Sequence, residues 1–115
     1  MILYRPVGSS ELKLIEQSEY KRFPPQLPEQ PIFYPVLNRE YAREIAKKWN
    51  VKSTSDHKGF VLQYNVDDEY SAQFEIHTVG KSYHQEFWVP AGELDNFNQH
   101  IIGTIKVVDE FSDNE

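Results

Sequence analysis

Three strand-like segments follow one another in the second half of the chain with no helix between them, and this order constrains the fold more than any other feature. In segment 59–66, large apolar residues occupy every second position, which is the period of a strand with one buried face. Segments 74–79 and 82–89 are rich in aromatic and β-branched residues, and Gly80 lies in the turn between them. Strands that are consecutive in sequence usually pair as antiparallel neighbours. The sequence therefore predicts a largely antiparallel sheet in which these last two segments form a hairpin.

The rest of the chain supplies short strands and short helices around this sheet. The expected elements are a strand at 2–5, a helix from Ser9 or Ser10 to about Gln17, a strand at 32–36, a helix at 38–49, a helical segment at 91–101 and a strand at 103–111. We expect a single α+β domain over residues 1–111, with a mostly antiparallel split sheet and two to three short helices. The acidic tail at 112–115 is expected to fray.

The clearest helix is the segment NREYAREIAKKW at 38–49. Asn38 is a favoured N-cap, and Tyr41, Ile45 and Trp49 recur at every fourth position with two alanines beside them. Charged side chains occupy the opposite face. This pattern predicts that the aromatic stripe faces the core and does not form a cofactor site.

The segment FPPQLPEQP at 23–31 contains four prolines, which exclude a helix or a central strand. An extended, ordered loop is expected. The spacing from Pro25 to Pro28 also matches a P-x-x-P ligand of SH3 domains, but its position inside a domain favours the loop.

Composition and charge exclude several classes of protein. The chain has 115 residues and no cysteine, which excludes disulfide scaffolds, thiol nucleophiles and Cys-ligated zinc and fits a cytoplasmic protein. No segment is apolar enough for a signal peptide or a membrane span. The net charge of −6 argues against general nucleic-acid binding. Residues 1–58 nevertheless carry ten Lys and Arg against seven Asp and Glu, so this half either binds an anionic ligand or simply has a solvated surface. No P-loop, G-x-G-x-x-G or nucleophile elbow is present.

The segment HQEFWVP at 84–90 places a carboxylate between large aromatic residues. Strand alternation puts Phe87 and Val89 on one face, with His84, Glu86 and Trp88 on the other. Glu86 is then either an ordinary half-exposed residue or a cleft residue with a perturbed pKa. A zinc site made of His77, His84 and Glu86 is a further alternative, but a straight strand brings only two of these ligands to one face, and we expect no metal.

With its elements in this order, the chain resembles the ADP-ribosyltransferase superfamily, and it also resembles small bacterial proteins labelled "ADP-ribosylation/crystallin J1". That family places an Arg or His in a first strand, a Ser-Thr-Ser or Tyr segment before a helix, a long strand, and a Glu-x-Glu sequence before an apolar strand end. The corresponding segments here are LYRP at 3–6, FYPVLNREYAREIAKKW at 33–49, GFVLQYNV at 59–66 and HQEFWVP at 84–90.

The resemblance implies an NAD-binding ADP-ribosyltransferase or NAD glycohydrolase that cleaves the nicotinamide–ribose bond, with a possible protein acceptor. Arg5 would bind an NAD phosphate or ribose, Tyr34 would lie against nicotinamide, and Glu86 would be the catalytic carboxylate that stabilises the positive charge on the ribose. His84 replaces the first Glu of Glu-x-Glu, which argues against transfer to arginine, and the resemblance makes His84 a further candidate for binding NAD. The sequence Ser53-Thr54-Ser55 follows the helix instead of preceding it, and we interpret it as a coincidence. The alternative is a non-catalytic immunity or regulatory module on the same fold that binds a nucleotide or a protein partner.

Overall fold

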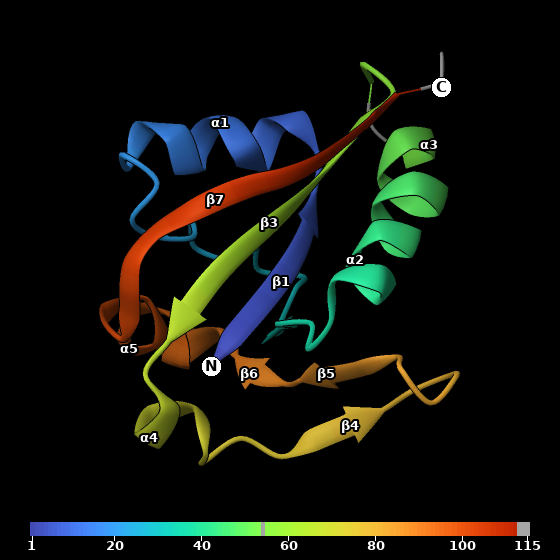
Figure 1. Cartoon of the computed structure of the whole chain (residues 1–115). Coiled ribbons are helices and arrows are strands. Elements are labelled where there is room, and N and C mark those ends of the chain that lie inside the picture. The colour runs from blue at the N-terminus through green and yellow to red at the C-terminus, as the bar shows by residue number, and fades with distance from the viewer. Residues whose placement is uncertain (54, 113–115) are drawn as a thin grey trace.

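A three-stranded antiparallel sheet forms the centre of the computed structural model, which describes residues 1–53 and 55–112 (Figure 1). Its strand order is β1-β3-β7, and two short antiparallel pairs, β2 with β6 and β4 with β5, complete the β structure. The strands are β1 (Ile2–Val7), β2 (Ile32–Phe33), β3 (Lys58–Val66), β4 (Ile76–Thr78), β5 (Gln85–Phe87), β6 (Val89–Pro90) and β7 (Ile101–Ser112). The expected α+β fold with antiparallel pairing, including the hairpin between β4 and β5, is confirmed.

Short helices cover both sides of the central sheet. They are α1 (Ser9–Gln17), α2 (Arg39–Ile45), the π-helical turn η1 (Ala46–Asn50), α3 (Val51–Ser53), α4 (Asp68–Ser71), the 3₁₀ turn η2 (Ala91–Glu93) and α5 (Leu94–Gln99). The α4 turn was not expected, and it forms because the Asp67 side chain accepts a hydrogen bond from the Tyr70 amide at 2.8 Å. None of the helices in the described part of the chain is long and apolar enough to span a bilayer.

The larger part of the core lies between the sheet and α1, where α1 buries Leu12 and Ile15. Four aromatic rings pack together there, with centroids 4.8 to 5.5 Å apart. The pairs Phe23–Tyr64 and Phe33–Phe97 pack edge to face, and the pair Phe23–Phe33 is tilted. Phe23 anchors the start of the proline-rich segment, because its amide and carbonyl also bond to the side chain of Asn98. Segment 23–31 contains no helix or strand, which confirms the prediction of an extended loop.

A smaller core lies on the other side of the sheet, under the helical rod α2–η1–α3 (Figure 1). The rod packs on the sheet through Ala42 and Ala46, which are fully buried, whereas Trp49 is 69% exposed. The prediction that Trp49 faces the core is therefore wrong. The backbones are too close for large side chains, since a Cβ on Gly59 of β3 would lie 2.6 Å from the Ala46 carbonyl oxygen.

Two further expectations differ in detail from the structure. The strand expected at 82–89 divides into β5 and β6, with Trp88 between them, and Ile101 belongs to β7 instead of to the preceding helix. Thr54, in the centre of the Ser-Thr-Ser sequence, and tail residues 113–115 lie outside the described residues.

Candidate functional site

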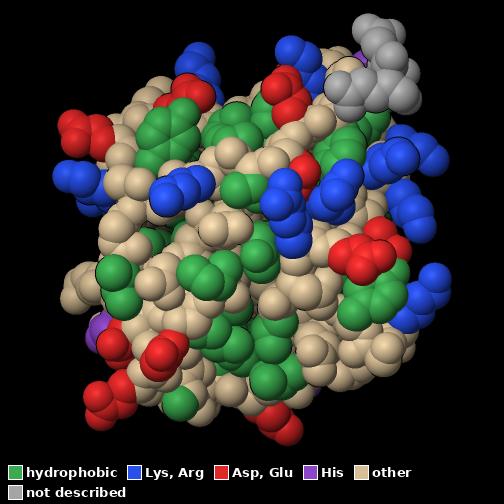
Figure 2. All heavy atoms as spheres, in the orientation of Figure 1, with side chains coloured by type: hydrophobic (Ala, Val, Ile, Leu, Met, Phe, Trp, Pro, Cys, Tyr) green, Lys and Arg blue, Asp and Glu red, His purple; other side chains and the backbone are tan. Residues whose placement is uncertain are grey.

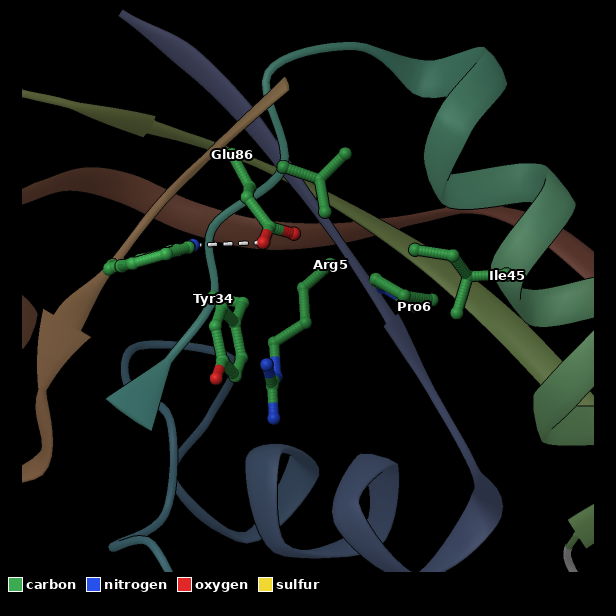
Figure 3. Close-up of a pocket in the computed structure, with 7 residues that line it drawn as sticks. Arg5, Pro6, Tyr34, Ile45 and Glu86 are labelled. Carbon is green, nitrogen blue, oxygen red and sulfur yellow. Dashed lines mark hydrogen bonds between the residues drawn. The ribbon is translucent and has the colours of Figure 1, made fainter. Parts of the chain in front are cut away.

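A pocket of about 340 Å³ opens where β1, the segment that follows β2, α2 and β5 meet (Figure 3). We call it the Glu86 pocket, and its lining residues are Arg5, Pro6, Tyr34, Val36, Ile45, Glu86 and Trp88. Three of the four residues singled out in the sequence, Arg5, Tyr34 and Glu86, thus line one cavity. A volume of this size lies within the range of small-molecule sites, about 300–1,000 Å³.

Backbone pairing around Val36 brings these elements together. Val36 exchanges two hydrogen bonds with Tyr4 of β1, at 2.8 and 2.9 Å, and it forms an antiparallel bridge to Glu86 on its other side. The Leu37 amide donates a hydrogen bond to the Gln85 carbonyl at 3.0 Å, and the Phe87 amide donates one to the Pro35 carbonyl at 2.9 Å. The segment after β2 therefore lies between β1 and β5 like an additional strand, and it carries Tyr34 to the pocket.

Glu86 points its carboxylate into the pocket, where two side chains hold it. The Trp88 indole N–H donates to Oε1 at 2.9 Å, and the Tyr41 hydroxyl donates to Oε2 at 3.4 Å. Burial, and then the negative charge and hydrogen bond of Glu86, raise the pKa of Tyr41, so this hydroxyl remains a donor. The Trp88 ring is itself supported by His77 of β4, which stacks on it at 3.7 Å. The carboxylate is thus half-buried and oriented on the pocket wall.

The strand alternation predicted for this segment is confirmed. Phe87 and Val89 are 2% and 0% exposed, while Trp88 is 45% exposed and faces the other way. Glu86 shares the outer face with Trp88, but Tyr41 of α2 partly covers it. Alternation indicates the face of a residue, whereas a helix distant in sequence decides whether that face is open.

Arg5 lines the pocket but directs its guanidinium away from Glu86 and toward α1 (Figure 3). It forms a two-pronged ion pair with Glu11, in which Nε donates to Oε2 at 2.5 Å and Nη2 donates to Oε1 at 2.9 Å. The guanidinium carbon also lies 4.5 Å from the centre of the Phe33 ring. Burial acts to lower the pKa of Arg5, but the charge and hydrogen bonds of Glu11 outweigh burial and raise the pKa. The positive charge of Arg5 is therefore balanced within the fold.

Tyr34 and Arg5 also form a wall that the Glu86 pocket shares with a second cavity. This cavity, the proline-loop cavity, has a volume of about 300 Å³. Its other lining residues are Glu11, Gln26, Glu29, Gln30, Pro31 and Ile32. The Tyr34 side chain is 43% exposed, so its ring is accessible to a ligand.

His84, the fourth residue singled out in the sequence, does not line the Glu86 pocket. Its Nε2 bonds to Glu44 at 2.9 Å, its Nδ1 accepts from the Lys81 amide at 3.1 Å, and its ring stacks on Tyr41 at 4.4 Å. Because Nδ1 is an acceptor, the proton is assigned to Nε2, whose N–H donates a hydrogen bond to Glu44. Both ring nitrogens are engaged, and His84 therefore positions Tyr41 and Glu44 and leaves neither nitrogen free for a ligand.

Sequence reasoning missed the part that α2 plays. Tyr41 and Ile45 were assigned to the core and Glu44 to the solvent face, yet Tyr41 bonds to Glu86 and Glu44 bonds to His84 and to the Tyr83 hydroxyl. The bonds from Tyr83 and His84 lower the pKa of Glu44, and the bond to Glu44 raises the pKa of Tyr83 to about 12. The only signal in the sequence was that Tyr41 and Glu44 lie three residues apart on one helix face.

In residues 1–53 and 55–112, no group of three His, Cys, Asp or Glu side chains is arranged to hold a metal ion. His77 stacks on Trp88 and His84 bonds to Glu44, so these two histidines do not converge with Glu86 on one point. Comparisons of the chain with models of known families, with curated proteins and with solved structures find no match.

Proposed function

We propose that the Glu86 pocket binds NAD and that the protein cleaves its nicotinamide–ribose bond, as an NAD glycohydrolase or an ADP-ribosyltransferase. One observation carries the proposal. Arg5, Tyr34 and Glu86 come from three segments far apart in the chain, were singled out in the sequence, Glu86 by its aromatic neighbours and all three by the resemblance, and line one cavity.

The carboxylate of Glu86 suits the proposed chemistry. When the glycosidic bond breaks, nicotinamide leaves with the bonding electrons and positive charge develops on the ribose. Glu86, fixed by Trp88 and Tyr41, presents a negative charge that needs no rearrangement at that moment. Water or another nucleophile then bonds to the same carbon and loses a proton, which yields free or transferred ADP-ribose.

The two cavities that meet at Arg5 and Tyr34 suit a ligand with two ring-bearing halves. Tyr34 offers a ring face at the junction, and the guanidinium of Arg5 keeps N–H groups that Glu11 does not occupy, because Glu11 accepts from only Nε and Nη2. These groups would bond to a phosphate oxygen between the two halves.

Proton NMR of NAD incubated with the protein tests the proposal through the signal of free nicotinamide. We expect release by the wild type and by Glu69→Gln, which makes the same charge change at an exposed site. Glu86→Gln should reduce the rate at least a hundredfold, since removal of one such electrostatic contact costs roughly 10²–10³ in rate. Equal release by the wild type and Glu86→Gln would refute the role of Glu86.

The Arg5–Glu11 pair favours a second candidate, a non-catalytic module that binds a nucleotide or a protein partner. Because Glu11 already balances the charge of Arg5, the pocket attracts a phosphate less strongly than a free arginine would. In the same NMR experiment, broadened NAD resonances without nicotinamide release would support this candidate. Sharp, unchanged NAD signals at millimolar ligand would exclude NAD as the ligand in both cases.

A further inference from the structure

A second open site, which the proposed NAD chemistry does not use, lies along α2 and η1. This groove has a volume of about 460 Å³, and we call it the Trp49 groove. Its lining residues are Tyr41, Glu44, Ile45, Lys48, Trp49 and His84. Ile45 also lines the Glu86 pocket, so the two sites are neighbours that share a wall.

The packing of the helical rod explains why this groove is aromatic. Ala42 and Ala46 take up the buried side of the rod, so the large residues beside them are left on the outer side. Trp49 itself lies in the π-helical turn that continues α2. The Trp49 indole is 69% exposed, so its ring face is accessible to a ligand.

The rings of the groove form a surface on which a flat ligand can stack. Tyr41 and His84 are already stacked face to face, with planes inclined by 20°, and His84 is held in place by Glu44. The open indole of Trp49 adds a further ring face. Aromatic side chains of this kind stack on the flat faces of bases, and every base offers such a face.

The groove carries one carboxylate, Glu44, and one ammonium, Lys48, and the two differ in how far their hydrogen-bonding capacity is used. Glu44 keeps its negative charge, because the bonds from Tyr83 and His84 lower its pKa, but both of its oxygens already accept hydrogen bonds from these two residues. Lys48 lies one helical turn after Glu44 and its charge helps to lower the pKa of that carboxyl, but its ammonium forms no hydrogen bond with the described residues and is available to a ligand. Lysine and arginine side chains also gather over the side of the molecule where α2 and α3 lie (Figure 2). A negative group on a ligand can therefore bond to Lys48, whereas a cation would find the Glu44 oxygens already in use.

We propose that the Trp49 groove binds a planar aromatic ring that carries a negatively charged group, as a nucleotide does. The ring stacks on Trp49 and Tyr41, and the charged group bonds to Lys48. This site is separate from the Glu86 pocket, and its occupation does not depend on NAD cleavage.

The two tryptophans of the chain make the experiment selective, since Trp49 lies in the groove and Trp88 lines the pocket. In Trp88→Phe the only indole is Trp49, and in Trp49→Phe the only indole is Trp88. We would excite each variant at a wavelength that nucleotides do not absorb and titrate it with AMP. Adenosine, inorganic phosphate and tetramethylammonium are the comparison probes, because each has only part of the proposed chemistry or the opposite charge.

We expect AMP to change the emission of Trp88→Phe with a saturable dependence on concentration, and adenosine to bind about tenfold more weakly. Adding Lys48→Gln should weaken AMP about tenfold and leave adenosine unchanged, whereas Lys47→Gln, a matched charge change outside the lining of the groove, should have little effect. A response of Trp88 alone would overturn the proposal, as would equal affinity for AMP and adenosine or a stronger response to tetramethylammonium. Because nicotinamide release is not measured, these outcomes are independent of the proposed NAD cleavage.

Discussion

The ion pair between Arg5 and Glu11 gives the sharpest prediction about stability. Strand alternation places Arg5 on the same face of β1 as the buried Leu3, so its guanidinium enters the side of the sheet that α1 covers. The Arg5 and Glu11 side chains are only 15% and 26% exposed. Removing one partner of a buried pair costs about 3–5 kcal/mol, whereas an exposed pair is worth roughly 0.2–1 kcal/mol.

We expect Glu11→Gln to lose about 3 kcal/mol, the lower end of the buried range, because the pair retains some contact with water and glutamine keeps one acceptor oxygen. That loss corresponds to a fall in Tm of roughly 12 °C for a domain of about this size. Urea unfolding followed by far-UV circular dichroism measures it. Glu16→Gln is the control, since this residue is exposed on the same helix, and it should change the free energy of unfolding by less than about 0.5 kcal/mol.

A double variant separates the ion pair from the shape of the site. Arg5→Met combined with Glu11→Leu removes both charges, and it should recover most of the stability that Glu11→Gln loses, because apolar residues of similar volume replace buried ion pairs at little cost. A loss below about 1 kcal/mol for Glu11→Gln would show that water solvates Arg5, and the reasoning from burial would then be refuted.

Two further predictions concern α2 and its surroundings. Gly59→Ala should destabilise the protein by about 1–3 kcal/mol, because the new Cβ meets the Ala46 carbonyl oxygen at 2.6 Å. The urea midpoint measures this loss. A midpoint equal to that of the wild type would show that the rod shifts away from β3 without cost. Folding raises the pKa of Tyr83 from 10.0 to about 12 through its bond to Glu44, so the stability from this bond is complete below pH 10 and is lost as the pH rises through about 12. Between pH 8 and pH 11 the urea midpoint of the wild type should therefore fall more than that of Tyr83→Phe. An equal fall in the two proteins would show that the bond from Tyr83 to Glu44 does not contribute to stability.

Local pattern predicted much of the fold. The helix expected from Ser9 or Ser10 to about Gln17 is observed at Ser9–Gln17, and the strand expected at 59–66 is observed at Lys58–Val66. Both segments have a strong hydrophobic period that only one secondary structure satisfies. The inward direction of Phe87 was predictable for the same reason.

Contacts between distant segments were not predictable in this way. Tyr41, Ile45 and Trp49 form one helix stripe and the two alanines another, and the sequence alone favoured the larger side chains for the core. The backbones of the rod and β3 approach so closely at Gly59 that only the small alanine side chains fit between them. Likewise, no local pattern indicated that Glu11 meets Arg5, because this contact depends on the docking of α1 against the sheet.

The position of α2 connects the two sites. Because the rod approaches β3 closely at Gly59, Tyr41 comes within hydrogen-bond distance of Glu86 while its ring stacks on His84. Ile45 then separates the Glu86 pocket from the Trp49 groove and contributes to the lining of both. A larger residue at the alanine positions would move the rod outward, withdraw the Tyr41 hydroxyl from the carboxylate and change the shape of the groove. The small residues under the helix, which touch neither site, therefore set the geometry of both.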